Sequence, residues 1–164
     1  MGLDMSLYRE VQMKGKMEIT DKKLDEVLGG ENMRPSVRHE VCYWRKFNAL
    51  HKYFNDHFNE QDNDNCVDMY MNIEDIKELL ELVKKIRGAV KMEKDGEQIA
   101  NPEVCKELPT EEDFFFGSTD YDKYYVSDLD LTIEQLSKVI DDHEKLIEAG
   151  VAEYDIDYYY RAWY

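Results

Sequence analysis

Apolar and polar residues alternate at both ends of the chain. Near the amino end, Leu3, Met5 and Leu7 alternate with more polar neighbours, and the pattern continues to about residue 12. Residues 152–164 alternate in the same way, with Ile156 and Ala162 on one face. A period of two is typical of a strand that buries one face. The sequence therefore predicts a strand at each end.

Apolar residues spaced by three and four predict helices between these strands. The clearest pattern covers residues 36–58, with Ser36 as N-cap directly after Pro35. The apolar face of this segment comprises Val37, Val41, Trp44, Phe47, His51, Phe54 and Phe58. We therefore expect one continuous helix over residues 36–58, which also carries most of the local positive charge.

Further helices are expected in three other segments. Residues 20–28 form a short one, ended by two glycines, and a second begins after Asn72 and stops near Gly88. A third opens at Ser127 or Asp128 and runs to about residue 147.

Short apolar runs predict strands at 67–71 and 114–116, and polar residues 59–65 predict a loop. With no linker long enough to divide the chain, residues 1–164 are expected to form one domain. The predicted fold class is α+β: a small mixed or antiparallel sheet that includes both terminal strands, with two to three helices packed on one face.

The net charge of −16 argues against binding to partners that are themselves strongly negative. Such a surface repels nucleic acid and anionic membranes and attracts basic protein surfaces. The charge is uneven: residues 109–164 hold fifteen Asp or Glu against four Lys or Arg, whereas residues 34–52 hold five Lys or Arg against one Glu. The sequence predicts neither direct nucleic-acid binding nor membrane binding.

Polar residues interrupt the apolar face of segment 36–58. Trp44, Asn48 and His51 share that face, and buried polar groups need hydrogen-bond partners. One interpretation is that these groups are satisfied within the core. The other is a pocket for a phosphate-bearing or nucleotide-like ligand, which suits a ring, an amide and nearby cations. Its cations would be Arg45, Lys46 and Lys52.

The turn at residues 117–122 offers two more hydroxyl groups to such a pocket, on Ser118 and Thr119. Its backbone N–H groups and these hydroxyls could bind an anion, or they could hold a structural turn before a helix. Neither GxxxxGK[ST] nor GxGxxG is present, which favours the structural turn.

No metal or cofactor is expected. DNDNC at 62–66 begins like a calcium loop, but Val67 and Ile73 stand where that loop needs Gly and Glu. Paired Cys spacing typical of zinc is missing. Three cysteines without regular spacing favour reduced thiols, and residues 1–12 have no signal-peptide pattern, so we expect a cytoplasmic location.

Three motifs together carry a resemblance: MGLDM-x-L at the start, YWRK-x-N-x-x-H from Tyr43 to His51, and FFFGST-x-YD-x-YY from Phe114 to Tyr125. The chain resembles a family of small acidic proteins of bacteriophages and mobile elements, for which no activity is established. The resemblance implies a context, the bacterial cytoplasm during infection, in which small accessory proteins often counter host defence.

Three hypotheses follow. The first is a non-catalytic protein that inhibits a host defence protein, such as a nuclease, as an anti-CRISPR or nucleic-acid mimic. Its predicted surface comprises Asp120, Asp122, Asp155, Asp157, Tyr159 and Trp163. The second is a sponge for a nucleotide-like signal, bound between segment 36–58 and the 117–122 turn. The third and least favoured is an enzyme with His51 as general base near Asp120 or Asp122. The sequence does not determine the oligomeric state, and it is compatible with a homo-oligomer.

Overall fold

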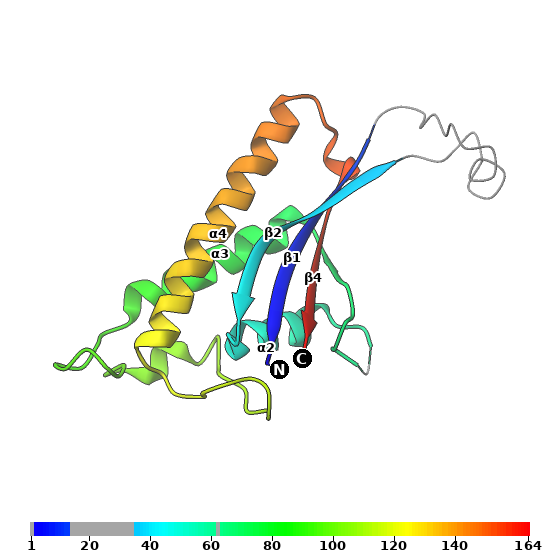
Figure 1. The fold of residues 1–164 in the computed structure, drawn as a ribbon. Coiled ribbons are helices and arrows are strands. Elements are labelled where there is room, and N and C mark those ends of the chain that lie inside the picture. Colours follow the sequence, from blue (N-terminus) through cyan, green and yellow to red (C-terminus); the bar gives the residue numbers. More distant parts are fainter. Residues whose placement is uncertain (1, 14–34, 62) are drawn as a thin grey trace.

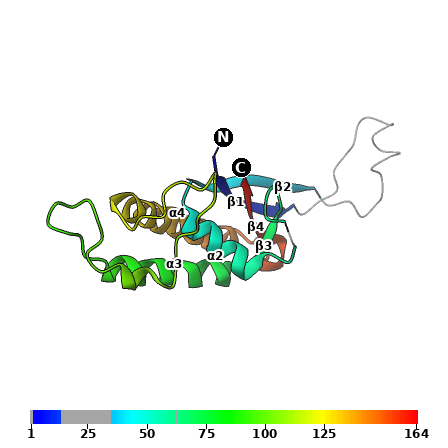
Figure 2. The same cartoon turned by 90° about the horizontal axis from the view of Figure 1, so that it is seen from below.

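One layer of the protein is an antiparallel sheet and the other is helical (Figure 1, Figure 2). The computed structural model describes residues 2–13, 35–61 and 63–164. In this part of the chain the strands are β1 (Asp4–Gln12), β2 (Ser36–Arg45), β3 (Met69–Met71) and β4 (Ile156–Trp163), in the order β2-β1-β4-β3. The first and last strands pair at the centre, from Asp4 opposite Trp163 to Val11 opposite Ile156.

The helices are α2 (Asn48–Phe58), α3 (Ile73–Ala89) and α4 (Lys123–Glu148), with short 3₁₀ turns at η1 (Pro102–Cys105) and η2 (Glu153–Asp155). All three α-helices lie on the same face of the sheet (Figure 2). The α+β prediction, with both terminal strands in the sheet and helices on one face, is confirmed. The helix expected at residues 20–28 lies outside the described residues. None of the described helices has the length and apolar character needed to cross a membrane.

Helix ends follow from side-chain caps. Asn72 begins α3 as expected, because its side chain accepts the N–H groups of Glu74 and Asp75 while the Asp75 carboxylate accepts that of Asn72. The start expected for α4 is wrong. Asp122, not Ser127 or Asp128, is its cap, and its carboxylate accepts the N–H groups of Tyr124 and Tyr125.

The continuous helix predicted over residues 36–58 is wrong. Residues 36–45 form strand β2, and only 48–58 are helical. Two features explain why the sequence pattern did not indicate this strand. A bulge lets Leu7 pair with Cys42 and Tyr8 with Glu40, which leaves Val41 extra and breaks the period of two. Lys46 then adopts a φ of 60°, which no α-helix tolerates, and separates strand from helix.

Segment 114–116 is a turn rather than the predicted buried strand, with Phe114 92% exposed and Phe116 4% exposed. The main core lies between sheet and helices, where alternate side chains of β1 and β4 meet α2, α3 and α4. It includes Leu7, Trp44, Phe54, Leu80, Leu136 and Tyr160. The opposite face of the sheet carries no described helix (Figure 2).

Candidate functional site

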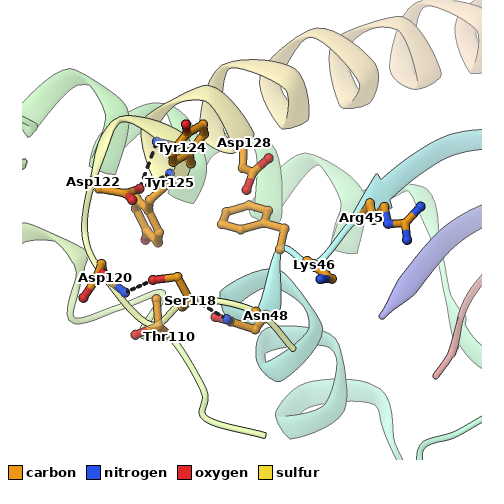
Figure 3. Close-up of a pocket in the computed structure, with 12 residues that line it drawn as sticks. Arg45, Lys46, Asn48, Thr110, Ser118, Asp120, Asp122, Tyr124, Tyr125 and Asp128 are labelled. Atoms are coloured by element: carbon orange, nitrogen blue, oxygen red, sulfur yellow. Dashed lines mark hydrogen bonds between the residues drawn. The ribbon is translucent and has the colours of Figure 1, made fainter. Parts of the chain in front are cut away.

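A pocket of about 390 Å³ opens where the β2–α2 connection meets the 117–122 turn and the start of α4 (Figure 3). We call it the Lys46 pocket. Its lining residues are Arg45, Lys46, Phe47, Asn48, Thr110, Gly117, Ser118, Asp120, Asp122, Tyr124, Tyr125 and Asp128. Segments far apart in sequence therefore form the pocket together.

Lys46 is held by its backbone and by two glycines. Its N–H donates to the Leu3 carbonyl at 2.8 Å, which ties the left-handed residue to the start of β1. A Cβ at Gly2 would lie 2.8 Å from Lys46 Cε, and one at Gly117 would lie 3.4 Å from Lys46 Cβ and Cδ. The two glycines thus leave room for the lysine stem. A non-glycine residue in the left-handed region costs about 1 kcal/mol or more and is often found at functional sites.

Arg45 and Lys46 are exposed, and neither forms an ion pair with a described residue. Lys52, by contrast, lies 3.0 Å from Asp56 and 4.0 Å from Glu111. In a chain of net charge −16, two adjacent cations without carboxylate partners are unexpected. Together they carry about eight N–H donors, five on the guanidinium and three on the ammonium group, with which they can bind an anion.

The wall that belongs to α4 and the preceding turn carries carboxyl groups. Asp122 is used as the helix cap, whereas Asp120 and Asp128 make no side-chain hydrogen bond or ion pair with a described residue. Burial, and next the charge of Asp122, raise the pKa of Asp128 to about 6. Figure 3 shows Asp128 and Tyr124 on the first turns of α4, across the pocket from Lys46. The pocket therefore has a cationic rim and a carboxyl-bearing wall.

Asn48 holds the third wall of the pocket, formed by the segment that leads into the 117–122 turn. Its Nδ2 donates to the Ser118 carbonyl at 2.8 Å and the Phe116 carbonyl at 3.2 Å, and its Oδ1 accepts the Glu111 N–H at 3.2 Å. Within the turn, Ser118 Oγ accepts the Asp120 N–H at 3.1 Å. These bonds hold the Phe116 and Ser118 carbonyls and the Asp120 N–H in place, and the turn thereby shapes the pocket.

The structure brings four of the eight predicted ligand residues together: Arg45, Lys46, Asn48 and Ser118 line the pocket. Thr119 is exposed outside the pocket lining, and its carbonyl accepts the Thr110 hydroxyl at 2.9 Å. Lys52 lies on α2 outside the lining, paired as described above.

Trp44 and His51 are buried in the core, 1% and 0% exposed, so the prediction that they contact a ligand is wrong in this structure. Trp44 Nε1 donates to Thr132 Oγ1 at 3.0 Å. His51 Nδ1 lies 2.8 Å from the Tyr160 hydroxyl and Nε2 3.3 Å from Asp64. Burial lowers the pKa of His51, with Asp64 opposing the change, and both contacts suit a neutral ring. These groups are satisfied structural polars.

The predicted partner surface is divided. Asp120 and Asp122 line the pocket, whereas Asp157, Tyr159 and Trp163 lie in β4 with side chains on the face opposite the helices. Asp155 is 4% exposed within η2, because the chain turns there to enter β4. Its placement on a binding surface is therefore wrong.

Several lining residues escaped sequence reasoning: Phe47, Thr110, Tyr124, Tyr125 and Asp128. A signal for three of them was present. With Asp122 as N-cap, Tyr124, Tyr125 and Asp128 fall within one turn of each other at spacings of three and four. Because α4 was expected to begin only at Ser127 or Asp128, this spacing was not recognised as helical.

The general base that the third hypothesis requires does not lie in the Lys46 pocket. His51, the residue proposed as general base, lies outside the pocket with both ring nitrogens in contact with neighbouring side chains. Among the described residues, no group of three or more His, Cys, Asp or Glu is placed to hold a metal ion.

Comparisons with protein-family models, with curated proteins and with solved structures found no match for this chain. The resemblance to proteins of mobile elements thus stays a prediction, and the functional argument rests on the geometry of the Lys46 pocket.

Proposed function

We propose that the protein is a non-catalytic binder of a small phosphate-bearing ligand of nucleotide type, held in the Lys46 pocket. One observation carries the proposal: Arg45 and Lys46 form no ion pair with any residue that the structure describes, and they lie on the rim of a pocket of about 390 Å³. Charge-assisted hydrogen bonds from Arg and Lys to phosphate are among the strongest that a protein offers.

The rest of the pocket suits the remainder of a nucleotide. Tyr124, which is 68% exposed, offers an aromatic face on which a base can stack. Asp120 and Asp128 carry free carboxyl groups, which accept hydrogen bonds from the amino and ring N–H groups of a base. A simple inorganic anion would leave this acidic wall unused, so the mixed charge favours a ligand with an anionic end and a hydrogen-bond-donating end.

In the phage or mobile-element context that the resemblance implies, such a binder would act as a sponge. By occupying a nucleotide signal, it would lower the free concentration that a host defence system senses. This proposal requires affinity and abundance but no chemical step.

A thermal-shift screen tests the proposal on the full chain. Linear and cyclic nucleotides are compared with their unphosphorylated nucleosides and with inorganic phosphate, each at millimolar concentration. A bound nucleotide at about one hundred times its Kd should raise the melting temperature by about 5 °C or more. The nucleoside should give a much smaller shift, because it lacks the group that Arg45 and Lys46 bind.

Two outcomes would contradict the proposal. One is the absence of a shift with every nucleotide tested. The other is an equal shift with nucleotide and nucleoside, which would show that the cations do not recognise the phosphate.

A further inference from the structure

The face of the sheet opposite the helices carries a row of tyrosines across three strands. Tyr8 of β1 pairs with Tyr159 of β4, and Tyr159 pairs with Tyr70 of β3. The rings of Tyr70 and Tyr159 lie edge to face with centroids 5.9 Å apart, and Tyr70 is 53% exposed. Since no described helix covers this face (Figure 2), the row is open to a partner.

Arg38 shows that the row attracts cations. Its guanidinium lies 4.7 Å from the Tyr8 ring centroid and 4.9 Å from that of Tyr159. Two hydrogen bonds of 2.7 and 2.9 Å to Asp68 hold it there. The aromatic surface is therefore fixed before any partner arrives, which lowers the entropy lost on binding.

In the neighbouring row, Arg38 of β2 lies opposite Glu10, but its guanidinium is bonded to Asp68. Glu10 and Asp157 are directly opposite each other in β1 and β4, and neither forms an ion pair with a described residue. Like charges at directly opposed positions destabilise a sheet. Burial, and next the charge of Glu10, raise the pKa of Asp157. A cation placed between these carboxylates from outside would remove the repulsion.

We infer that this face docks a protein partner that presents Lys or Arg side chains, one of which lies between Glu10 and Asp157 with its aliphatic stem against Tyr70. The charge of the face favours this partner over nucleic acid. The carboxylates on and beside it are Asp4, Glu10, Glu40, Asp68 and Asp157, against the cations Arg38, Arg45 and Arg161. Tyrosine, tryptophan and arginine, all found on this face, are the residue types that dominate binding at protein interfaces.

The site between Glu10 and Asp157 lies outside the lining of the Lys46 pocket, although Arg45 belongs to both this face and the pocket rim. It gives a location to the protein-partner hypothesis, with Asp157, Tyr159 and Trp163 of the originally expected surface on one face. Glu10, Tyr70 and Tyr8 join them through the strand register.

Fluorescence anisotropy at low salt tests the inference on the full chain, with labelled nona-arginine as the basic probe and oligouridylate as the nucleic-acid probe. The double variant Glu10→Gln/Asp157→Asn removes the carboxylate pair. It should weaken peptide binding about tenfold or more. Its melting temperature should stay level or rise, because a repulsion is removed, so lost binding cannot be blamed on unfolding.

The matched control is Asp141→Asn/Glu144→Gln, which removes the same charge from two exposed carboxylates of α4. We expect it to change peptide binding by less than about twofold. Equal weakening by both double variants would overturn the inference, since the peptide would then sense only net charge. No peptide binding by the unaltered chain, or tighter binding of oligouridylate than of the peptide, would overturn it as well.

Discussion

Residues 44–51 place two kinds of polar group side by side. Trp44, Asn48 and His51 point into the protein, and their polar atoms are paired with Thr132, with backbone groups of the 111–118 segment, and with Tyr160 and Asp64. Arg45 and Lys46 line the Lys46 pocket and are paired with no described carboxylate. The polar atoms of the first group form hydrogen bonds that hold the fold, whereas those of Arg45 and Lys46 are available to a ligand.

The contrast shows which cations of this acidic protein have no carboxylate partner. Most described Lys and Arg side chains on the surface have a carboxylate within ion-pair distance, as Lys52, Lys85 and Arg87 do. A minority of the described surface cations lack such a partner, and two of them are adjacent at the Lys46 pocket, which is the basis of the proposal that it binds a ligand. The buried group should therefore respond to mutation through stability, and the rim cations through ligand binding.

The largest expected effect is on His51. Replacing it with alanine leaves a cavity and removes the partner of the Tyr160 hydroxyl, so we expect a loss of about 3 kcal/mol in the free energy of unfolding. Urea denaturation monitored by circular dichroism measures it.

His57 supplies the matched control, since it lies on the same helix, is exposed, and stacks on Tyr53. His57→Ala should cost less than about 0.5 kcal/mol. Equal losses for the two variants would mean that the buried network does not stabilise the fold as described.

Asn48→Ala should cost about 2 kcal/mol, because it removes three hydrogen bonds at a site that is 2% exposed. The same urea titration measures it. Since these bonds hold the turn at Ser118, the variant should also weaken ligand binding. A loss of stability below about 0.5 kcal/mol would show that the 111–118 segment is held by other contacts.

Asp128 gives a smaller, pH-dependent effect. Its pKa is raised to about 6 in the folded state from an ordinary 3.8, so the folded protein holds this proton more tightly than the unfolded chain. Its contribution to stability therefore falls as pH rises from about 4 to 6 and stays unfavourable above that range. Asp128→Asn should stabilise by about 1 kcal/mol near pH 8, after allowance for partial exposure, and by almost nothing near pH 4.

Melting curves of both proteins across this pH range measure the difference. A gain that is equal at the two ends of the range would contradict the assigned titration of Asp128.

Both terminal strands and most of α3 could be predicted from the sequence, because their periodicity is regular and Asn72 supplies a clear cap. Strand β2 could not, since the bulge at Val41 makes residues 37–58 match a helical spacing by coincidence. Only part of the lining of the Lys46 pocket could be predicted from the sequence. Arg45, Lys46, Asn48 and Ser118 stood out as polar groups near the motifs, whereas Asp128 depends on the true start of α4.

Which of the polar residues at 44–51 are buried was not predictable either. In a continuous helix Trp44, Asn48 and His51 share a face with no indication of their partners. The strand, the left-handed Lys46 and the following helix place Thr132, Tyr160 and Asp64 around them. Thr132 lies 88 residues from Trp44 in the sequence, and Tyr160 lies 109 residues from His51. Local pattern cannot supply contacts made by tertiary packing.

The most direct test of the account is a calorimetric titration of the best nucleotide from the screen into the double variant Arg45→Gln/Lys46→Met. The methionine keeps the aliphatic stem between Gly2 and Gly117, so stability should change by less than about 0.5 kcal/mol. The control Lys91→Gln/Lys106→Met removes two other exposed cations that lie away from the pocket and form no ion pair with a described residue. We predict that the rim variant binds about tenfold or more weakly and that the control binds as the unaltered chain does. Unchanged affinity in the rim variant, or an equal loss in both, would contradict the assignment of the Lys46 pocket as the binding site.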